Sequence, residues 1–90
     1  MNVHAKIFPT AGICDKAREF DITLEQGGIN EVLAQVQEQL GMNADLRSNK
    51  ALMFLHNGRV LDQRRLTAGG NDLIFQDGDK LWLMPLLSGG

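Results

Sequence analysis

The residues of this sequence that could take part in chemistry lie at its end, where Gly89 and Gly90 follow an apolar stretch. Glycine lets another molecule approach the backbone closely, because it has no side chain. A Gly-Gly tail can therefore thread a narrow channel and present its carbonyl carbon from many directions. A free carboxylate is a poor acyl donor at neutral pH, so the tail needs activation, for example as an acyl-adenylate made with ATP. The catalysis must then come from another protein.

The other reactive side chains form no catalytic or metal-binding pattern. The sequence has no phosphate-binding P-loop and no G-x-G-x-x-G motif. His4 and His56 have no cysteine or carboxylate at metal-ligand spacing. Cys14 has no reactive-thiol signature and no obvious histidine partner. We therefore expect that the chain has no active site of its own and binds no metal or cofactor.

The composition is typical of one small globular domain. The 90 residues are 43% hydrophobic and 22% charged, with a formal net charge of −2. No apolar run approaches the roughly 20 residues that span a bilayer, and the start lacks the features of a signal peptide. Lysine and arginine form no basic stripe. We expect a cytoplasmic protein that binds neither membranes nor nucleic acids, and a single cysteine fits a reducing compartment.

Several segments have the pattern of β-strands. Period-two alternation and short apolar runs predict strands at residues 2–8, 19–24, 52–55, 60–61 and 80–86. Turn residues after the first strand favour an antiparallel hairpin. Asn57-Gly58 predicts a second hairpin, because both central positions of a type I′ turn need positive φ. Residues 62–76 are expected to be irregular, anchored by Leu66 and the cluster Leu73-Ile74-Phe75.

One helix is expected over residues 29–40. Its apolar residues recur at the spacing of a single helical face: Ile29, Val32, Leu33, Val36 and Leu40. Gly41 suits the left-handed C-terminal cap of this helix. A single helix must bury its apolar stripe against one sheet, which predicts a two-layer α+β domain.

Residues 77–90 resemble the ending of the MoaD/ThiS-type sulfur carriers, with a D-G-D turn, a final apolar strand, a proline and a Gly-Gly end. Asn57-Gly58 resembles the turn after the third strand of that family. The resemblance implies a ubiquitin-like β-grasp fold, with a mixed sheet of four to five strands and one main helix packed on one face. It also implies a β-grasp domain over residues 1–86 and a flexible tail over residues 87–90.

The same resemblance implies a function and a set of partners. A ubiquitin-activating-type enzyme would adenylate Gly90 with ATP and magnesium, and Gly89 would help the tail to thread into that enzyme. A sulfur donor would then form a thiocarboxylate. The acceptor would be an enzyme such as the large subunit of molybdopterin synthase, or an enzyme of thiamine thiazole synthesis. The chain itself would be a carrier rather than an enzyme.

The last strand is apolar on both faces, although one helix can cover only one face of the sheet. By alignment with the family, Leu81 and Leu83 face the core while Trp82 and Met84 face outward. The partner-binding residues expected from this are Phe54, Trp82, Met84, Leu86 and Leu87. The alternative for Trp82 is that it only covers neighbouring side chains.

Two other functions remain open at this point. The chain could be a ubiquitin-like modifier joined to lysines through its Gly-Gly end, because the activation chemistry is the same. It could also be a β-grasp interaction module in which the terminal glycines are incidental, since most domains have frayed ends.

Overall fold

The computed structural model describes residues 1–10, 12–25, 27–41, 46, 49, 51–61 and 74–86. Within these ranges the chain forms β1 (Asn2–Ile7), β2 (Arg18–Thr23), α1 (Ile29–Leu40), β3 (Leu52–His56), β4 (Arg59–Val60) and β5 (Lys80–Pro85). Each strand predicted from the sequence is present, and its ends differ from the prediction by at most one residue. The predicted helix has the predicted ends.

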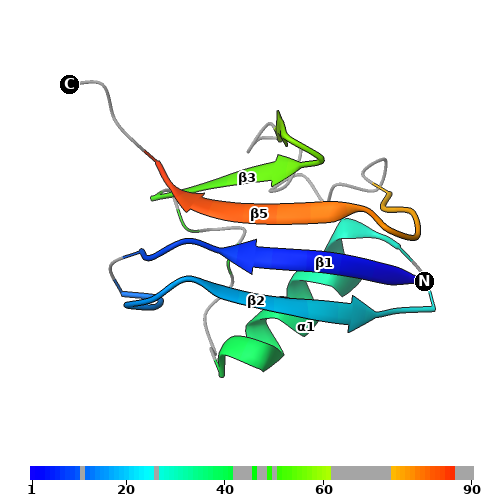
Figure 1. The fold of residues 1–90 in the computed structure, drawn as a ribbon, viewed down its shortest axis with the longest axis horizontal. Coiled ribbons are helices and arrows are strands. Elements are labelled where there is room, and N and C mark those ends of the chain that lie inside the picture. Colours follow the sequence, from blue (N-terminus) through cyan, green and yellow to red (C-terminus); the bar gives the residue numbers. More distant parts are fainter. Residues whose placement is uncertain are drawn as a thin grey trace.

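The five strands form one mixed sheet in the order β2-β1-β5-β3-β4. The last strand of the chain lies in the middle of this sheet, where β5 pairs with β1 in parallel and with β3 antiparallel. β2 pairs antiparallel with β1, which confirms the first hairpin. Figure 1 shows that α1 lies across one face of the sheet. The chain therefore has the predicted α+β architecture, a β-grasp fold.

The core lies between α1 and the sheet face that it covers. Alternate residues of the strands point into it, because successive side chains of a strand lie on opposite faces. The buried members are Val3, Ala5, Ile7, Ile22, Leu52, Phe54, Leu81 and Leu83 from the strands, and Ile29, Val32, Leu33 and Val36 from the helix. Complete burial of one large aliphatic side chain contributes about 1.5–3 kcal/mol. The opposite side of the sheet is called the outer face below.

The helix begins and ends as the sequence predicts. Its four buried residues are those of the predicted apolar face, and Leu40 packs half-buried against the core. Gly41 has a φ of 70° and donates its backbone N–H to the carbonyls of Gln37 and Glu38. This is the left-handed cap that favours glycine, because a side chain in that conformation is strained.

The turns fix how the strands follow one another. Asn57 has a φ of 52° and Gly58 a φ of 86°, which confirms the predicted positive-φ hairpin turn.

The segment before β5 was predicted to be anchored by apolar side chains. Phe75 is buried, as expected of an anchor, but Ile74 is 62% exposed, so its prediction as an anchor was wrong. The two side chains of neighbouring extended residues point to opposite sides, and only one of them can enter the core. Leu66 and Leu73 lie outside the described residues.

Candidate functional site

The side chains of β5 alternate between the core and the outer face. Leu81 and Leu83 are completely buried, whereas Trp82 and Met84 are half-buried on the opposite side. This confirms the orientation that the sequence analysis gave to these four residues. Half-burial on the face opposite α1 leaves part of each side chain accessible to another molecule.

The assignment of Phe54 to the partner-binding surface was wrong. Phe54 is 2% exposed and lies opposite Leu83 in the sheet, on the core side. Residues directly opposite each other on paired strands share a face, so β3 presents its other residues outward. Met53, which lies opposite Met84, is half-buried on the outer face in place of Phe54.

Apolar side chains gather on one half of the outer face. This apolar outer patch consists of Phe8, Met53, Leu55, Val60, Trp82 and Met84. Val60 is 62% exposed, and the others are half-buried. The rings of Phe8 and Trp82 meet edge to face, with their centroids 5.7 Å apart. An apolar surface of several neighbouring side chains is typical of a protein-binding site.

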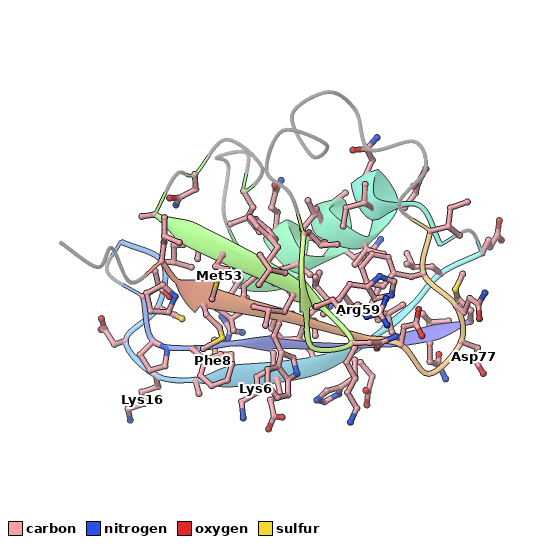
Figure 2. All side chains as sticks on the ribbon, turned by 90° about the horizontal axis from the view of Figure 1, so that it is seen from above. Lys6, Phe8, Lys16, Met53, Arg59 and Asp77 are labelled. Atoms are coloured by element: carbon pink, nitrogen blue, oxygen red, sulfur yellow. The ribbon has the colours of Figure 1, made fainter. Side chains whose placement is uncertain are left out.

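A lysine lies against the two aromatic rings of the patch. The ammonium of Lys6 is 4.8 Å from the centroid of Phe8 and 5.9 Å from that of Trp82. Figure 2 shows Lys6 and Phe8 projecting from the side of the sheet opposite α1. Such cation–π contacts contribute about 0.5–1 kcal/mol at exposed sites. The sequence analysis missed both residues, although the alternation of β1 already placed Lys6 and Phe8 on one face.

The chain leaves the sheet beside this patch. After β5 ends at Pro85, the backbone N–H of Leu86 still donates to the carbonyl of Ala51 at 2.7 Å. Leu86 is 50% exposed, so its side chain is open to contact with a partner. The predicted tail residues Leu87, Gly89 and Gly90 lie outside the described residues.

A polar cluster joins the turn after β3 to the turn before β5. The Asp79 carboxylate accepts hydrogen bonds from Asn57 Nδ2 (3.0 Å), the backbone N–H of Gln76 (2.8 Å) and His56 Nε2 (2.8 Å). The hydrogen bond from Asn57 is the main cause that lowers the pKa of Asp79 to about 2. The His56 ring also lies against Phe75, with 4.1 Å between the ring centroids. We call this group the Asp79 clamp.

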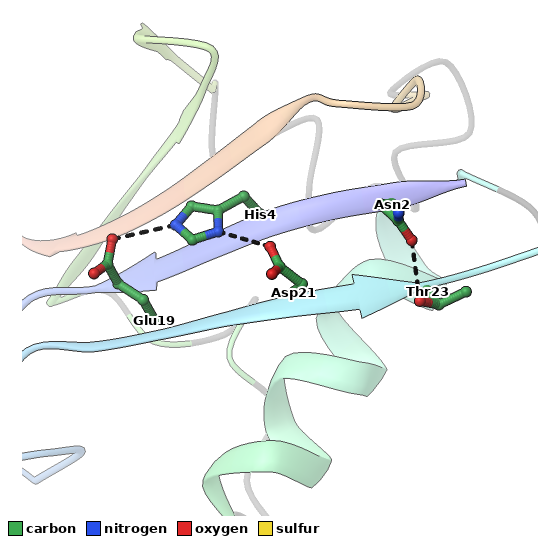
Figure 3. Close-up of polar contacts among 5 residues, drawn as sticks. All are labelled: Asn2, His4, Glu19, Asp21 and Thr23. Atoms are coloured by element: carbon green, nitrogen blue, oxygen red, sulfur yellow. Dashed lines mark hydrogen bonds and ion pairs between the residues drawn. The ribbon is translucent and has the colours of Figure 1, made fainter.

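A second polar cluster lies on the other half of the outer face. His4 Nδ1 is 2.9 Å from Asp21 Oδ1, and His4 Nε2 is 3.2 Å from Glu19 Oε1 (Figure 3). The hydrogen bond with Asp21, followed by that with Glu19, raises the pKa of His4 above its ordinary value of 6.5. Nearby, Thr23 donates to Asn2 (Figure 3). The outer face thus has a polar half on β2 and β1 and an apolar half toward β4.

The described residues contain no group of three or more His, Cys, Asp or Glu side chains arranged to hold a metal ion. The half-buried Cys14 thiol donates to the carbonyl of Phe8 at 3.6 Å. No helix within the described residues has the length and apolar content needed to cross a membrane.

Searches of known sequences and structures complement this geometry. No family model and no curated protein matches the sequence. Among solved structures, a chain in the complex of subunits 1 and 2 of the molybdopterin-converting factor from Helicobacter pylori is 22% identical, with a TM-score of 0.62 and 100% of both chains covered. SAMP1 from Haloferax volcanii is 18% identical, with a TM-score of 0.67 and full coverage of both chains.

The small archaeal modifier protein 1 from Methanosarcina acetivorans is 19% identical, with a TM-score of 0.61 and coverage of 99% of this chain and 96% of that one. At such identities, the likeness establishes the fold and leaves the activity to the site. All three similar chains extend over nearly the whole sequence, so the likeness includes every strand and the helix described above. The chain therefore has the ubiquitin-like β-grasp fold, and its structural neighbours agree with the resemblance to MoaD/ThiS-type proteins.

Proposed function

We propose that this protein is a carrier that reacts through Gly90 and is recognised through its outer face. The observation that carries the proposal is the position of the apolar outer patch on β5, the strand that leads directly to the Gly-Gly pair. A partner that binds Trp82 and Met84 is close to the point where the chain leaves the sheet at Leu86. Recognition and reaction can therefore occur on one partner.

The distance from the sheet to the reactive group is short. Gly90 is four residues beyond Leu86 in the sequence. An extended chain spans at most about 3.6 Å per residue, so Gly90 can reach no more than about 14 Å from Leu86. The active site of the partner must therefore open within this distance of its docking surface. Glycine at positions 89 and 90 suits a channel too narrow for side chains.

The proposed chemistry has two steps. The Gly90 carboxylate attacks the α-phosphorus of ATP in an adenylating enzyme, which forms an acyl-adenylate and releases pyrophosphate. Sulfide released by the sulfur donor then displaces AMP, and the resulting Gly90 thiocarboxylate carries the sulfur to an acceptor. Magnesium and ATP belong to the activating enzyme, and the carrier supplies the carboxylate and the docking surface.

Sulfur transfer in cofactor biosynthesis is the function we propose first. It is supported by the D-G-D-to-Gly-Gly ending and by the structural likeness to a chain of a molybdopterin-converting factor. Because that neighbour was solved as a complex of two subunits, a large-subunit enzyme is the proposed acceptor. We expect this activity inside the cytoplasm, where the activating enzyme has ATP.

Protein modification is the second candidate, and the likeness to two small archaeal modifier proteins favours it. The activation step would be the same. The final nucleophile would be a lysine amine of a target protein, which displaces the activating group and forms an isopeptide bond with Gly90.

Mass spectrometry of the protein from its native cells tests both candidates. The purified protein is alkylated, and the C-terminal peptide is then fragmented. Whole mass is insufficient, because oxidation of any of the four methionines adds nearly the same mass as replacing oxygen by sulfur. Alkylation located at Gly90, beyond that of Cys14, would establish the thiocarboxylate. Gly90 found in isopeptide bonds would establish the modifier.

A matched pair of variants tests the role of the outer face. Trp82→Ala should weaken binding to the adenylating enzyme by about 2 kcal/mol or more if Trp82 is an interface hot spot. The control is Ile74→Ala, which truncates another partly exposed apolar side chain outside the patch. Equal affinities for the two variants would refute recognition through the outer face, and a Gly90 that stays a bare carboxylate with ATP and adenylating enzymes would refute the carrier chemistry.

A further inference from the structure

A cleft of about 350 Å³ opens at one end of the outer face. It is lined by Asn57, Gly58, Lys80 and Trp82. Its volume is at the lower end of the range of about 300–1,000 Å³ that is usual for ligand pockets. The wall formed by the Trp82 indole is apolar, and the Lys80 side chain adds a positive charge. The cleft thus suits one apolar side chain with an acidic group beside it.

Lys6 and Lys80 lie on the outer face, and neither is paired with a carboxylate of the described residues. The Lys6 ammonium lies against the rings of Phe8 and Trp82. Glu19, which lies opposite Lys6 in the sheet, and Asp21 are both bonded to His4 (Figure 3). The two lysine charges therefore remain available to carboxylates of another molecule.

The Asp79 clamp holds the cleft in shape. The backbone N–H of Lys80 donates to Asn57 Oδ1 at 2.7 Å, and the backbone N–H of Asn57 donates to the carbonyl of Lys80 at 2.9 Å. Asn57 in turn donates to Asp79. A wall fixed in advance by hydrogen bonds loses little conformational freedom on binding, which favours affinity.

We propose that this cleft is the specificity site of the docking surface. Its occupant is a segment of the partner protein in which an apolar side chain lies against Trp82 and a neighbouring aspartate or glutamate pairs with Lys80. A second carboxylate of the same partner faces Lys6. The inference rests on the proposed function, in which a partner protein binds the outer face, and adds the chemistry that the partner must present.

Charge reversal with a matched control tests the inference. ATP–pyrophosphate exchange by the adenylating enzyme is measured against carrier concentration for wild type, Lys80→Glu and Arg59→Glu. Arg59 is an exposed cation on β4 whose side chain lies on the opposite side of the sheet, since its register partner is His56. All variants are first checked for an unchanged unfolding midpoint.

We expect Lys80→Glu to raise the KM for the carrier about tenfold at low salt with kcat unchanged, because close charge pairs act on binding. Arg59→Glu should stay within about twofold of wild type, and added salt should reduce the difference between the variants. Equal KM values for Lys80→Glu and Arg59→Glu would overturn the inference while the carrier proposal stands.

A second measurement does not depend on adenylation. It therefore decides the inference even if the wild-type protein gives no ATP–pyrophosphate exchange with the adenylating enzyme. A carbodiimide joins a lysine amine to a carboxylate in direct contact, and mass spectrometry locates the joined residues. In native extract, we expect Lys80 and Lys6 to be joined to aspartate or glutamate beside apolar residues of one protein. Coupling that is no stronger at these positions than at Lys16, an exposed loop lysine, would overturn the inference.

Discussion

The Asp79 carboxylate holds two turns together, and its loss should destabilise the fold measurably. Asp79 is 18% exposed and accepts three hydrogen bonds, from two side chains and one backbone N–H. Its pKa is lowered from 3.8 to about 2. A shift of this size corresponds to about 2.4 kcal/mol at most. Solvent screening reduces the value, so we expect Asp79→Asn to lower the free energy of unfolding by about 1–2 kcal/mol at pH 7.

The effect should depend on pH in one direction. Because the folded-state pKa of Asp79 lies below 3.8, its ionised form stabilises the fold above that pH. The contribution is lost as the pH falls from 3.8 toward 2, where Asp79 becomes protonated in the folded protein as well. The difference in free energy of unfolding between wild type and Asp79→Asn should therefore shrink over this range.

Urea unfolding followed by the fluorescence of Trp82, the single tryptophan, measures this difference. The curves are recorded at several pH values between 7 and 2.5. The control is Asp15→Asn, an exposed loop position, which should change stability by less than about 0.5 kcal/mol. Equal midpoints for wild type and Asp79→Asn at pH 7, or a difference that stays constant down to pH 2.5, would refute the reasoning.

Substitutions at three other positions give separate checks. Leu33→Ala removes a side chain that is 2% exposed in the core, and it should cost about 2–5 kcal/mol in urea unfolding; an unchanged midpoint contradicts the helix packing. Gly58→Ala should cost about 1–2 kcal/mol because of its φ of 86°, although no atom lies within 4 Å of the added Cβ; Gly58→Asn should cost less. His4 should titrate above 6.5 by NMR, and its contribution to stability should be present below 6.5 and lost as the pH rises through its folded-state pKa. Asp21→Asn should lower this midpoint, and an unchanged value argues against the pairing.

The local features of the fold could be predicted from the sequence because each depends on neighbouring residues. The helix and its cap at Gly41 follow from a spacing of three and four residues and from one glycine. The Asn57-Gly58 turn follows from the positive φ that its two positions require. The sequence of β5 did not decide which face is buried, since residues 81–84 are all apolar, but the resemblance to known carriers did.

The wrong assignment of Phe54 arose because the sequence of β3 does not alternate between apolar and polar residues. Leu52, Met53, Phe54 and Leu55 are all apolar, so alternation cannot tell which of them point inward. The register of β3 against β5 decides it, and that register pairs residues 25 to 33 positions apart, such as Phe54 with Leu83. The Asp79 clamp depends on the same register, because it joins residues 23 positions apart.

Within the described residues, one helix packs against a five-stranded sheet, and this accounts for the uneven outer face. A helix of 12 residues at about 1.5 Å per residue is about 18 Å long, enough to cover one face only. The polar half of the other face, with His4, Glu19 and Asp21, is suited to water. The apolar half is not covered by any other part of the described residues. An exposed apolar patch of this kind is typical of a surface that binds another protein. Since β5 contributes Trp82 and Met84 to the patch and then continues toward Gly90, we infer that covering the patch also positions the end of the chain that we propose to react.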